Sequence, residues 1–165
     1  MYNLIVYGSL LHIDELKKQN VDLSQIDLVK VKGFKRVFNQ LPSWRKVEGN
    51  KKSVLNIEAD KNAWFNALVI KNLDQEYVDA LDHRERGYDR VSLEDGSVTL
   101  YSDGSVLNDC IVYKGKVDKQ SDEILPIPEY FQICKSGAEC HGELFYKDYL
   151  KTTYQNTLDG NLELI

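Results

Sequence analysis

The stretch Leu4-Ile5-Val6-Tyr7-Gly8-Ser9-Leu10 joins an apolar β-strand to an abrupt Gly-Ser end. Backbone N–H groups that directly follow a strand have no partner in the sheet, so they can turn toward a bound anion. Glycine favours such a loop, because a residue without a Cβ lets the backbone approach a ligand closely. We therefore predict a strand that ends near Tyr7 and continues into an anion-binding loop at Gly8, Ser9 and Leu10.

The length and composition indicate a single globular domain over residues 1–165. Hydrophobic residues make up 42% of the chain and charged residues 28%, a balance typical of folded domains. No apolar run approaches the roughly 20 residues that span a bilayer, and the N-terminus lacks the features of a secretion signal. We therefore expect a cytoplasmic protein without a membrane partner.

The net charge is −5 with both signs interspersed, which argues against nucleic acid as a partner. The sequence leaves the oligomeric state open.

The three cysteines, Cys110, Cys134 and Cys140, are an odd number without CxxC spacing. In a cytosolic chain we expect them to be reduced and at least partly buried. Cys134, Cys140 and His141 are candidate zinc ligands, but a fourth ligand is missing and their spacing fits no common zinc pattern. We therefore expect no metal site.

The alternation of apolar segments and turn residues predicts many strands and a few helices. We expect strands over about residues 2–7, 27–39, 53–58, 63–70, 88–93, 97–102 and 109–113. We expect helices over about residues 13–19, 74–86, 128–135 and 139–153. Gly87 should end the second helix in a left-handed conformation, and Gly137 should end the third. Because few segments form regular βαβ units, the pattern predicts an α+β fold with a mixed, mostly antiparallel sheet flanked by helices, which enough twist could close into a barrel.

The helix expected over residues 74–86 carries a glutamate in its apolar row. Leu73, Tyr77 and Leu81 recur every four residues, and the next position in this row is Glu85, so its carboxylate should face inward. Burial and the negative end of the helix dipole would both raise the pKa of this carboxyl, toward the range that suits a general acid or base. The other interpretation is a surface ion pair with one of three neighbouring arginines: Arg84, Arg86 and Arg90. Periodicity alone favours the ion pair, since structural pairs also perturb pKa values.

Two of the ten tyrosines lie at the ends of expected elements, where pockets usually form. Tyr113 ends a strand, and Tyr130 lies in the first turn of a helix behind Pro126-Ile127-Pro128. Ser9 is a candidate hydrogen-bond donor rather than a nucleophile, because Tyr-Gly-Ser-Leu is not a G-x-S-x-G elbow.

Four segments, taken together, resemble the γ-glutamylcyclotransferase family. Tyr7-Gly8-Ser9-Leu10 is similar to that family's substrate-binding loop. Leu81-Asp82-His83-Arg84-Glu85 is similar to the Leu-Asp-x-x-Glu segment that holds its catalytic glutamate. Cys110-Ile111-Val112-Tyr113 resembles a strand whose last tyrosine lines the pocket. The segment from Pro126 through Tyr130 to Gly142 is similar to the C-terminal segment of the enzymes proper, whose tyrosine also reaches the site.

The resemblance implies a mixed, barrel-like fold that cyclises a γ-glutamyl amide to 5-oxoproline and releases an amino acid or an amine. Glu85 would take a proton from the α-amino group of this small-molecule substrate and pass it to the leaving nitrogen. The backbone N–H groups of Gly8–Leu10 would stabilise the oxyanion or hold the α-carboxylate. Tyr7, Tyr113 and Tyr130 would help to bind the substrate. The resemblance implies neither a metal nor an organic cofactor.

Two features depart from the family pattern and leave the substrate open. Leu10 stands where some family members carry Asn, and the region from Leu41 to Lys52, with Trp44 and Arg45, matches no family motif. That region is long for a connection, so it is either a lid or a variable loop. The alternatives are the same chemistry on glutathione or a γ-glutamylamine, and a non-catalytic module of the same fold that binds a γ-glutamyl compound or another metabolite.

Overall fold

The computed structural model describes residues 1–42, 52–122 and 124–165. Trp44 and Arg45, in the region that matches no family motif, lie outside the described residues. The strands are β1 (Tyr2–Val6), β2 (Ile26–Gln40), β3 (Lys52–Leu73), β4 (Tyr88–Ser92), β5 (Val98–Leu100), β6 (Cys110–Gly115), β7 (Leu125–Pro126), β8 (Thr153–Asn156) and β9 (Leu162–Leu164). The helices are α1 (Ile13–Lys18), α2 (Gln75–Arg84), α3 (Pro128–Glu139) and α4 (Glu143–Thr152), with short 3-10 helices η1 (Ser9–Leu11), η2 (Leu23–Gln25) and η3 (Val117–Lys119). The described helices are each too short or too polar to cross a bilayer.

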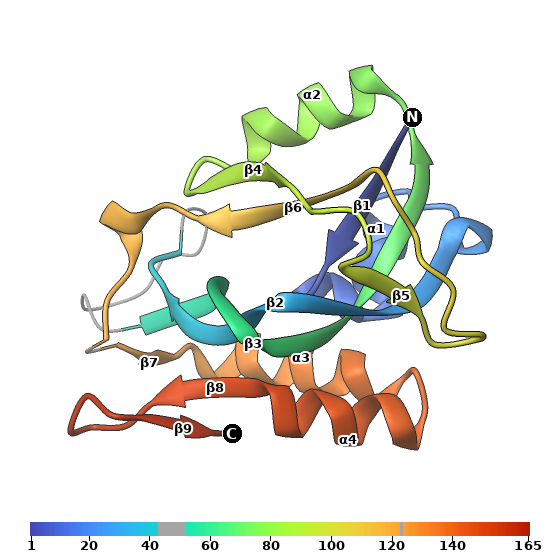
Figure 1. Cartoon of the computed structure of the whole chain (residues 1–165). Helices are drawn as coiled ribbons and strands as arrows, with labels where there is room; N and C mark the ends of the chain where they lie inside the picture. The colour runs from blue at the N-terminus through green and yellow to red at the C-terminus, as the bar shows by residue number, and fades with distance from the viewer. Residues whose placement is uncertain (43–51, 123) are drawn as a thin grey trace.

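The two longest strands, β2 and β3, form a bent antiparallel hairpin in the middle of the molecule (Figure 1). The sequence predicts two separate strands, 53–58 and 63–70, where the structure has β3. This prediction is wrong, because the polar residues between them form a bulge and do not end the strand. Residues 60–63 lie opposite Gly33 of β2, whose φ is +92°. Glycine adopts this φ without strain, so β2 can bend at the bulge.

The remaining strands extend this hairpin into one sheet with the order β4-β6-β1-β3-β2-β8-β9; β5 pairs with β2, and β7 with β3. β1 lies between β3 and β6, with Leu4 opposite Ile70 in antiparallel β3 and opposite Ile111 in parallel β6. Among the strands of the described residues, five pairs are antiparallel, and the pairs β1–β6, β2–β8 and β3–β7 are parallel. The predicted fold class, a mixed and mostly antiparallel sheet flanked by helices, is confirmed.

The chain that follows β6 returns to the end of β2 and pairs with it there. The N–H group of Leu41 donates to the carbonyl oxygen of Lys119 over 2.8 Å, and Ser121 donates in the same way to Asn39 over 3.0 Å. These main-chain bonds connect β2 with the region beyond β6, although β1 and β3 lie between β2 and β6 in the sheet order.

Helix α2 lies beside β4, and α3 and α4 lie together at the opposite end of the molecule (Figure 1). The α2 helix is the clearest success of the sequence pattern, since it begins one residue after and ends two residues before the predicted bounds of 74 and 86. The side chain of Asp74 caps its N-terminus by accepting a hydrogen bond from the N–H group of Tyr77 over 2.8 Å. Gly87 does not adopt the predicted left-handed conformation. The reason is that α2 already ends at Arg84, and Glu85 is its C-terminal cap with φ −89°.

Two predictions for the C-terminal helices are wrong. Gly137 lies inside α3 and does not end it, because the helix packs so closely on the backbone near His12 that a Cβ at residue 137 would lie 2.5 Å from the His12 nitrogen. Gly142, with φ +97°, separates α3 from α4, so the last helix begins at Glu143 and not at Glu139. The hairpin β8–β9, which the sequence pattern does not predict, follows α4.

A polar cluster is buried between β2, β3 and the end of α4. Arg36 is fully buried and donates from Nε to Thr153 Oγ1 over 2.8 Å. Its Nη1 donates to the carbonyl oxygen of Asn66 over 2.6 Å, and its Nη2 to Asn66 Oδ1 over 2.8 Å and to Thr152 Oγ1 over 3.2 Å. The guanidinium also lies 4.5 Å from the ring centroid of Tyr149. No acidic side chain of the described residues forms an ion pair with Arg36. The positive charge of the guanidinium is therefore stabilised by neutral hydrogen-bond acceptors and by the face of the Tyr149 ring.

Candidate functional site

A cavity of about 130 Å³ opens where β1 ends, between the end of α2 and the beginning of α3. All seven residues that the sequence singles out for the site line this cavity: Tyr7, Gly8, Ser9, Leu10, Glu85, Tyr113 and Tyr130. Much of the remaining wall is apolar and includes Leu55 and Leu81. The fold therefore brings these seven residues together, and their individual roles remain predictions.

The predicted anion-binding loop is the short helix η1, which begins directly after β1. The N–H groups of Leu11 and His12 close the turn by donating to the carbonyl oxygens of Gly8 and Ser9, each over 3.0 Å. Among the described residues, no hydrogen-bond acceptor is found for the N–H groups of Gly8, Ser9 and Leu10, as is usual at the start of a helix. Because these three residues line the cavity, its wall holds backbone donors that the fold leaves unused.

Helix α3 holds this turn at two points. At its first turn, the hydroxyl of Tyr130 lies so near to Gly8 that a Cβ there would be 2.5 Å from Oη. Two turns later, Gly137 packs against the carbonyl carbon of Leu11, which would lie 2.8 Å from a Cβ at residue 137. Just beyond the helix, His141 Nε2 lies 2.7 Å from the carbonyl oxygen of Leu11, and burial lowers the pKa of this imidazole. A Cβ would therefore clash at both positions, with the Tyr130 side chain at Gly8 and with the backbone of Leu11 and His12 at Gly137.

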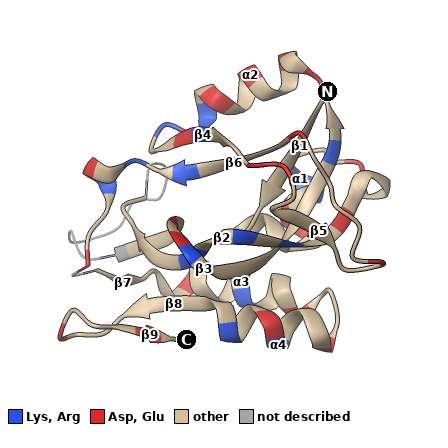
Figure 2. Ribbon diagram, viewed as in Figure 1, with Lys and Arg blue, Asp and Glu red and all other residues tan. Residues whose placement is uncertain are grey.

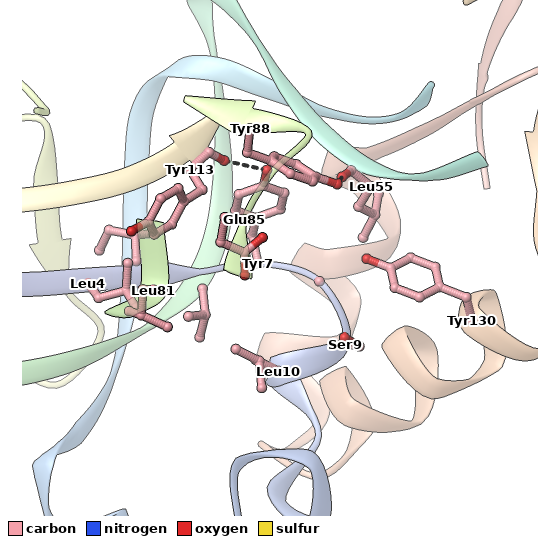
Figure 3. A pocket seen from close by; sticks show the side chains of 13 residues that line it. Leu4, Tyr7, Ser9, Leu10, Leu55, Leu81, Glu85, Tyr88, Tyr113 and Tyr130 are labelled. Atoms are coloured by element: carbon pink, nitrogen blue, oxygen red, sulfur yellow. Dashed lines mark hydrogen bonds between the residues drawn. The ribbon is translucent and has the colours of Figure 1, made fainter. Parts of the chain in front are cut away.

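Glu85 follows the last residue of α2, and its carboxylate faces the cavity. In Figure 3 this carboxylate and the Tyr130 hydroxyl face the same space from opposite sides. No cation of the described residues forms an ion pair with Glu85, and Arg90 pairs instead with Asp82 over 3.2 Å. Burial raises the pKa of the Glu85 carboxyl, and the positive charge of Arg84 opposes this shift. The geometry favours the inward-facing carboxylate over the surface ion pair.

Three tyrosine hydroxyls at the cavity already donate to protein atoms. Tyr7 Oη donates to the carbonyl oxygen of Tyr113 over 2.6 Å, and Tyr88 Oη to that of Leu55 over 2.8 Å (Figure 3). Tyr113 Oη donates to Asp82 Oδ1 over 2.6 Å. Burial is the main cause that raises the pKa of each of these phenols, so they keep their protons. Each hydroxyl therefore has lone pairs, but no free proton, for a ligand.

The sequence reasoning missed Tyr88 and Leu55 as residues of the cavity wall. Tyr88 is the first residue of β4, three positions after Glu85, so its place next to a candidate site residue was a usable signal. Leu55 carried no such signal, because its position in an apolar strand is typical of any core residue.

The residues considered for zinc lie apart from the cavity wall. Cys110 and Cys134 are buried and Cys140 is exposed, so the expected burial is wrong for Cys140; none of the three forms a disulfide bond. In the parts of the chain that the structure describes, no group of three or more His, Cys, Asp or Glu side chains could hold a metal ion. The imidazole of His141 contacts the Leu11 carbonyl instead. Figure 2 shows both signs of charge interspersed over the helices and strands.

No family model and no curated protein matches the sequence. The structure is similar to that of a γ-glutamyl cyclotransferase, with a TM-score of 0.68 and 19% identity, covering 98% of this chain and 93% of that chain. It is also similar to a yeast γ-glutamyl cyclotransferase specific to glutathione, with a TM-score of 0.63 and 14% identity, covering 92% and 96% of the two chains. YkqA from Bacillus subtilis matches with a TM-score of 0.63 and 18% identity over 84% of this chain but 48% of that chain, so the protein spans about half of YkqA. The order and pairing of the strands and these likenesses together show that the chain has the γ-glutamylcyclotransferase fold, as its motifs predict.

Proposed function

We propose that the protein is a γ-glutamylcyclotransferase-type enzyme, which cyclises a γ-glutamyl amide to 5-oxoproline and releases an amino acid or an amine. One observation carries this proposal. The half-buried carboxylate of Glu85 and the N–H groups of Gly8–Leu10, which have no ion-pair or hydrogen-bond partner among the described residues, line the same cavity. A base and a set of oxyanion donors that share one cavity are the two requirements of an intramolecular acyl transfer.

In this reaction the α-amino nitrogen of the substrate attacks its own γ-carbonyl carbon. Glu85 accepts a proton from that nitrogen, and the carbonyl oxygen gains negative charge as the ring closes. The bond from the γ-carbon to the leaving nitrogen then breaks, and Glu85 returns the proton to the leaving nitrogen. The raised pKa of Glu85 supports this exchange, because a carboxyl whose pKa is nearer to neutrality both accepts and donates a proton more readily.

Most of the rate enhancement should come from holding the substrate in a folded conformation, because both reacting groups belong to one molecule. The N–H groups of Gly8, Ser9 and Leu10 would bind the oxyanion or the α-carboxylate. Tyr7 and Tyr130 would confine the glutamyl chain between β1 and α3, and the Tyr7 hydroxyl has lone pairs to accept a hydrogen bond from the α-amino group.

The size of the cavity supports recognition of the glutamyl part of the substrate. Its volume of about 130 Å³ is close to the ~150 Å³ of a cavity that holds one benzene molecule. Such a volume suits a group of glutamate size and leaves the amine or amino acid that departs outside the narrow part. The proposal therefore extends to γ-glutamyl dipeptides, glutathione and γ-glutamylamines, which share the glutamyl group.

The experiment is a panel of these three substrate classes with 5-oxoproline as the common product. We expect turnover of at least one class by the wild type and loss of about 1,000-fold or more in kcat for Glu85→Gln, since the variant lacks the group that transfers the proton. Glu76→Gln is the matched control, because Glu76 is an exposed glutamate in the first turn of the same helix.

Near wild-type turnover by Glu85→Gln would contradict the role of Glu85. Inactivity of the wild type on the whole panel would contradict the enzyme proposal. If a γ-glutamyl compound still raised the melting temperature in that case, the protein would be a binding module of the same fold.

A further inference from the structure

The position of the Glu85 carboxylate depends on the last turn of α2. Glu85 lies just beyond the helix, and its N–H group still donates to the carbonyl oxygen of Leu81 over 2.9 Å. Its carbonyl oxygen accepts from the N–H group of Tyr88 over 3.0 Å, where β4 begins. The side chain itself has no ion pair among the described residues. Whatever fixes the last turn of α2 against the sheet therefore also fixes Glu85.

Asp82 makes that connection from within the last turn, three residues before Glu85. One oxygen of its carboxylate, Oδ1, accepts the hydrogen bond from Tyr113 Oη of β6 over 2.6 Å. The other, Oδ2, pairs with Arg90 Nη1 of β4 over 3.2 Å. Both oxygens of one side chain are thus bound to two neighbouring strands of the sheet, in a charge-assisted arrangement.

Tyr113 is itself held in place. Its carbonyl oxygen accepts the hydrogen bond from Tyr7 Oη over 2.6 Å, in the interior of the protein. Its own hydroxyl proton is donated to Asp82, away from the cavity that its ring lines. Tyr113 therefore connects the residue before the anion-binding turn, Tyr7, with the helix end that carries Glu85.

We propose that Tyr113 and Asp82, supported by Arg90, are positioning residues that hold the Glu85 carboxylate at the distance from the Gly8–Leu10 turn that cyclisation needs. This inference rests on the proposed function. It gives Tyr113 a role different from direct hydrogen bonding to the substrate, and it gives Asp82 and Arg90 a role in the site although neither lines the cavity wall.

A double-mutant cycle separates the two roles of Tyr113. If Tyr113 acts through Asp82, then Tyr113→Phe and Asp82→Ala break the same connection, and the double variant should be no slower than Asp82→Ala. If the hydroxyl of Tyr113 binds the substrate, the two effects should multiply. We expect each single variant to lower kcat by about 10- to 100-fold with little change in KM, because displacements near 1 Å have effects of that size.

Two further variants sharpen the result. Asp82→Asn keeps an oxygen that accepts from Tyr113 Oη, so it should recover most of the kcat that Asp82→Ala loses. Asp79→Ala is the matched control, because Asp79 lies on the same helix but accepts a hydrogen bond from Gln75 of the helix itself, over 2.7 Å. It should leave kcat unchanged.

Amide hydrogen exchange at Glu85 tests the positioning without turnover. We expect faster exchange of this N–H group in Tyr113→Phe and Asp82→Ala, and unchanged exchange in Asp79→Ala. A wild type inactive on every γ-glutamyl compound would overturn the proposed function, while the exchange rates would still report whether Asp82 and Tyr113 hold the helix end. Unchanged exchange in both variants, or multiplying effects on kcat, would overturn the positioning role.

Discussion

Two of the polar regions in the described part of this protein, around Arg36 and around Glu85, differ in how completely the fold satisfies their hydrogen-bonding groups. Around Arg36, the nitrogens of a fully buried guanidinium donate to Asn66, Thr152 and Thr153. Around Glu85, a half-buried carboxylate without an ion-pair partner among the described residues faces a cavity, and three N–H groups of the cavity wall also have no acceptor among these residues.

The difference separates a structural region from a candidate functional one. A buried polar group that is fully hydrogen-bonded makes the fold specific, whereas one without partners lowers its stability. The cavity therefore offers a carboxylate and backbone N–H groups that would pair with a ligand that has both an amino group and an anionic oxygen. We expect changes around Arg36 to alter stability, and changes around Glu85 to alter activity.

The largest effect on stability is expected for Arg36→Met. The variant removes the donors to four buried acceptors. The hydroxyls of Thr152 and Thr153 still donate to backbone carbonyl oxygens, but both oxygens of Asn66 lose the guanidinium. We expect the free energy of unfolding to fall by about 2–4 kcal/mol, measured by urea denaturation. Lys71→Met is the control, because Lys71 forms a partly exposed ion pair with Asp27 over 2.7 Å and should cost at most about 1 kcal/mol. Equal losses in the two variants would mean that the buried hydrogen bonds of Arg36 stabilise the fold no more than a partly exposed ion pair does.

A smaller effect is expected for Gly8→Ala, which tests how packing maintains the shape of the cavity. The new Cβ would lie 2.5 Å from Tyr130 Oη, so the variant should lose about 1–3 kcal/mol through overpacking. In a Tyr130→Phe background the nearest ring atom, Cζ, would lie 3.7 Å away, an ordinary contact. Gly8→Ala should therefore cost clearly less in that background, as thermal denaturation of the four proteins would reveal. The same cost in both backgrounds would mean that the Tyr130 hydroxyl does not limit residue 8.

The sequence predicted the cavity better than the cluster around Arg36, for a physical reason. Glu85 continues the row of Tyr77 and Leu81, so a local pattern made it a candidate for the site, and the resemblance to the γ-glutamylcyclotransferase family favoured the inward position over a surface ion pair. The partners of Arg36 come from β3 and the end of α4, far along the chain, and nothing local distinguishes Arg36 from an exposed arginine.

Among the sequence features that predicted where elements end, glycine was the least reliable. Gly137 was expected to end α3, but close packing against the backbone of Leu11 explains this residue. Because glycine has no Cβ, it is favoured both where the backbone adopts a positive φ in a turn and where another group approaches the backbone closely, so one residue type has two local interpretations. The tertiary contact that decides between them is absent from a single sequence.

The smallest expected effect is the pH dependence of stability, in which the charged groups of Glu85 and Arg36 should differ. Because burial raises the pKa of Glu85, the folded protein favours its protonated form. The stability that this group contributes is complete below its unfolded pKa of about 4.3 and is lost as the pH rises through the folded pKa. Glu85→Gln removes this dependence, so its free energy of unfolding relative to the wild type should increase between those two pKa values and then level off.

Burial lowers the pKa of Arg36 only to about 10, so Arg36 stays charged below pH 8 and adds no pH dependence of stability there. A difference between Glu85→Gln and wild type that stays constant from pH 4 to 8 would show that Glu85 is solvated like an ordinary surface carboxylate.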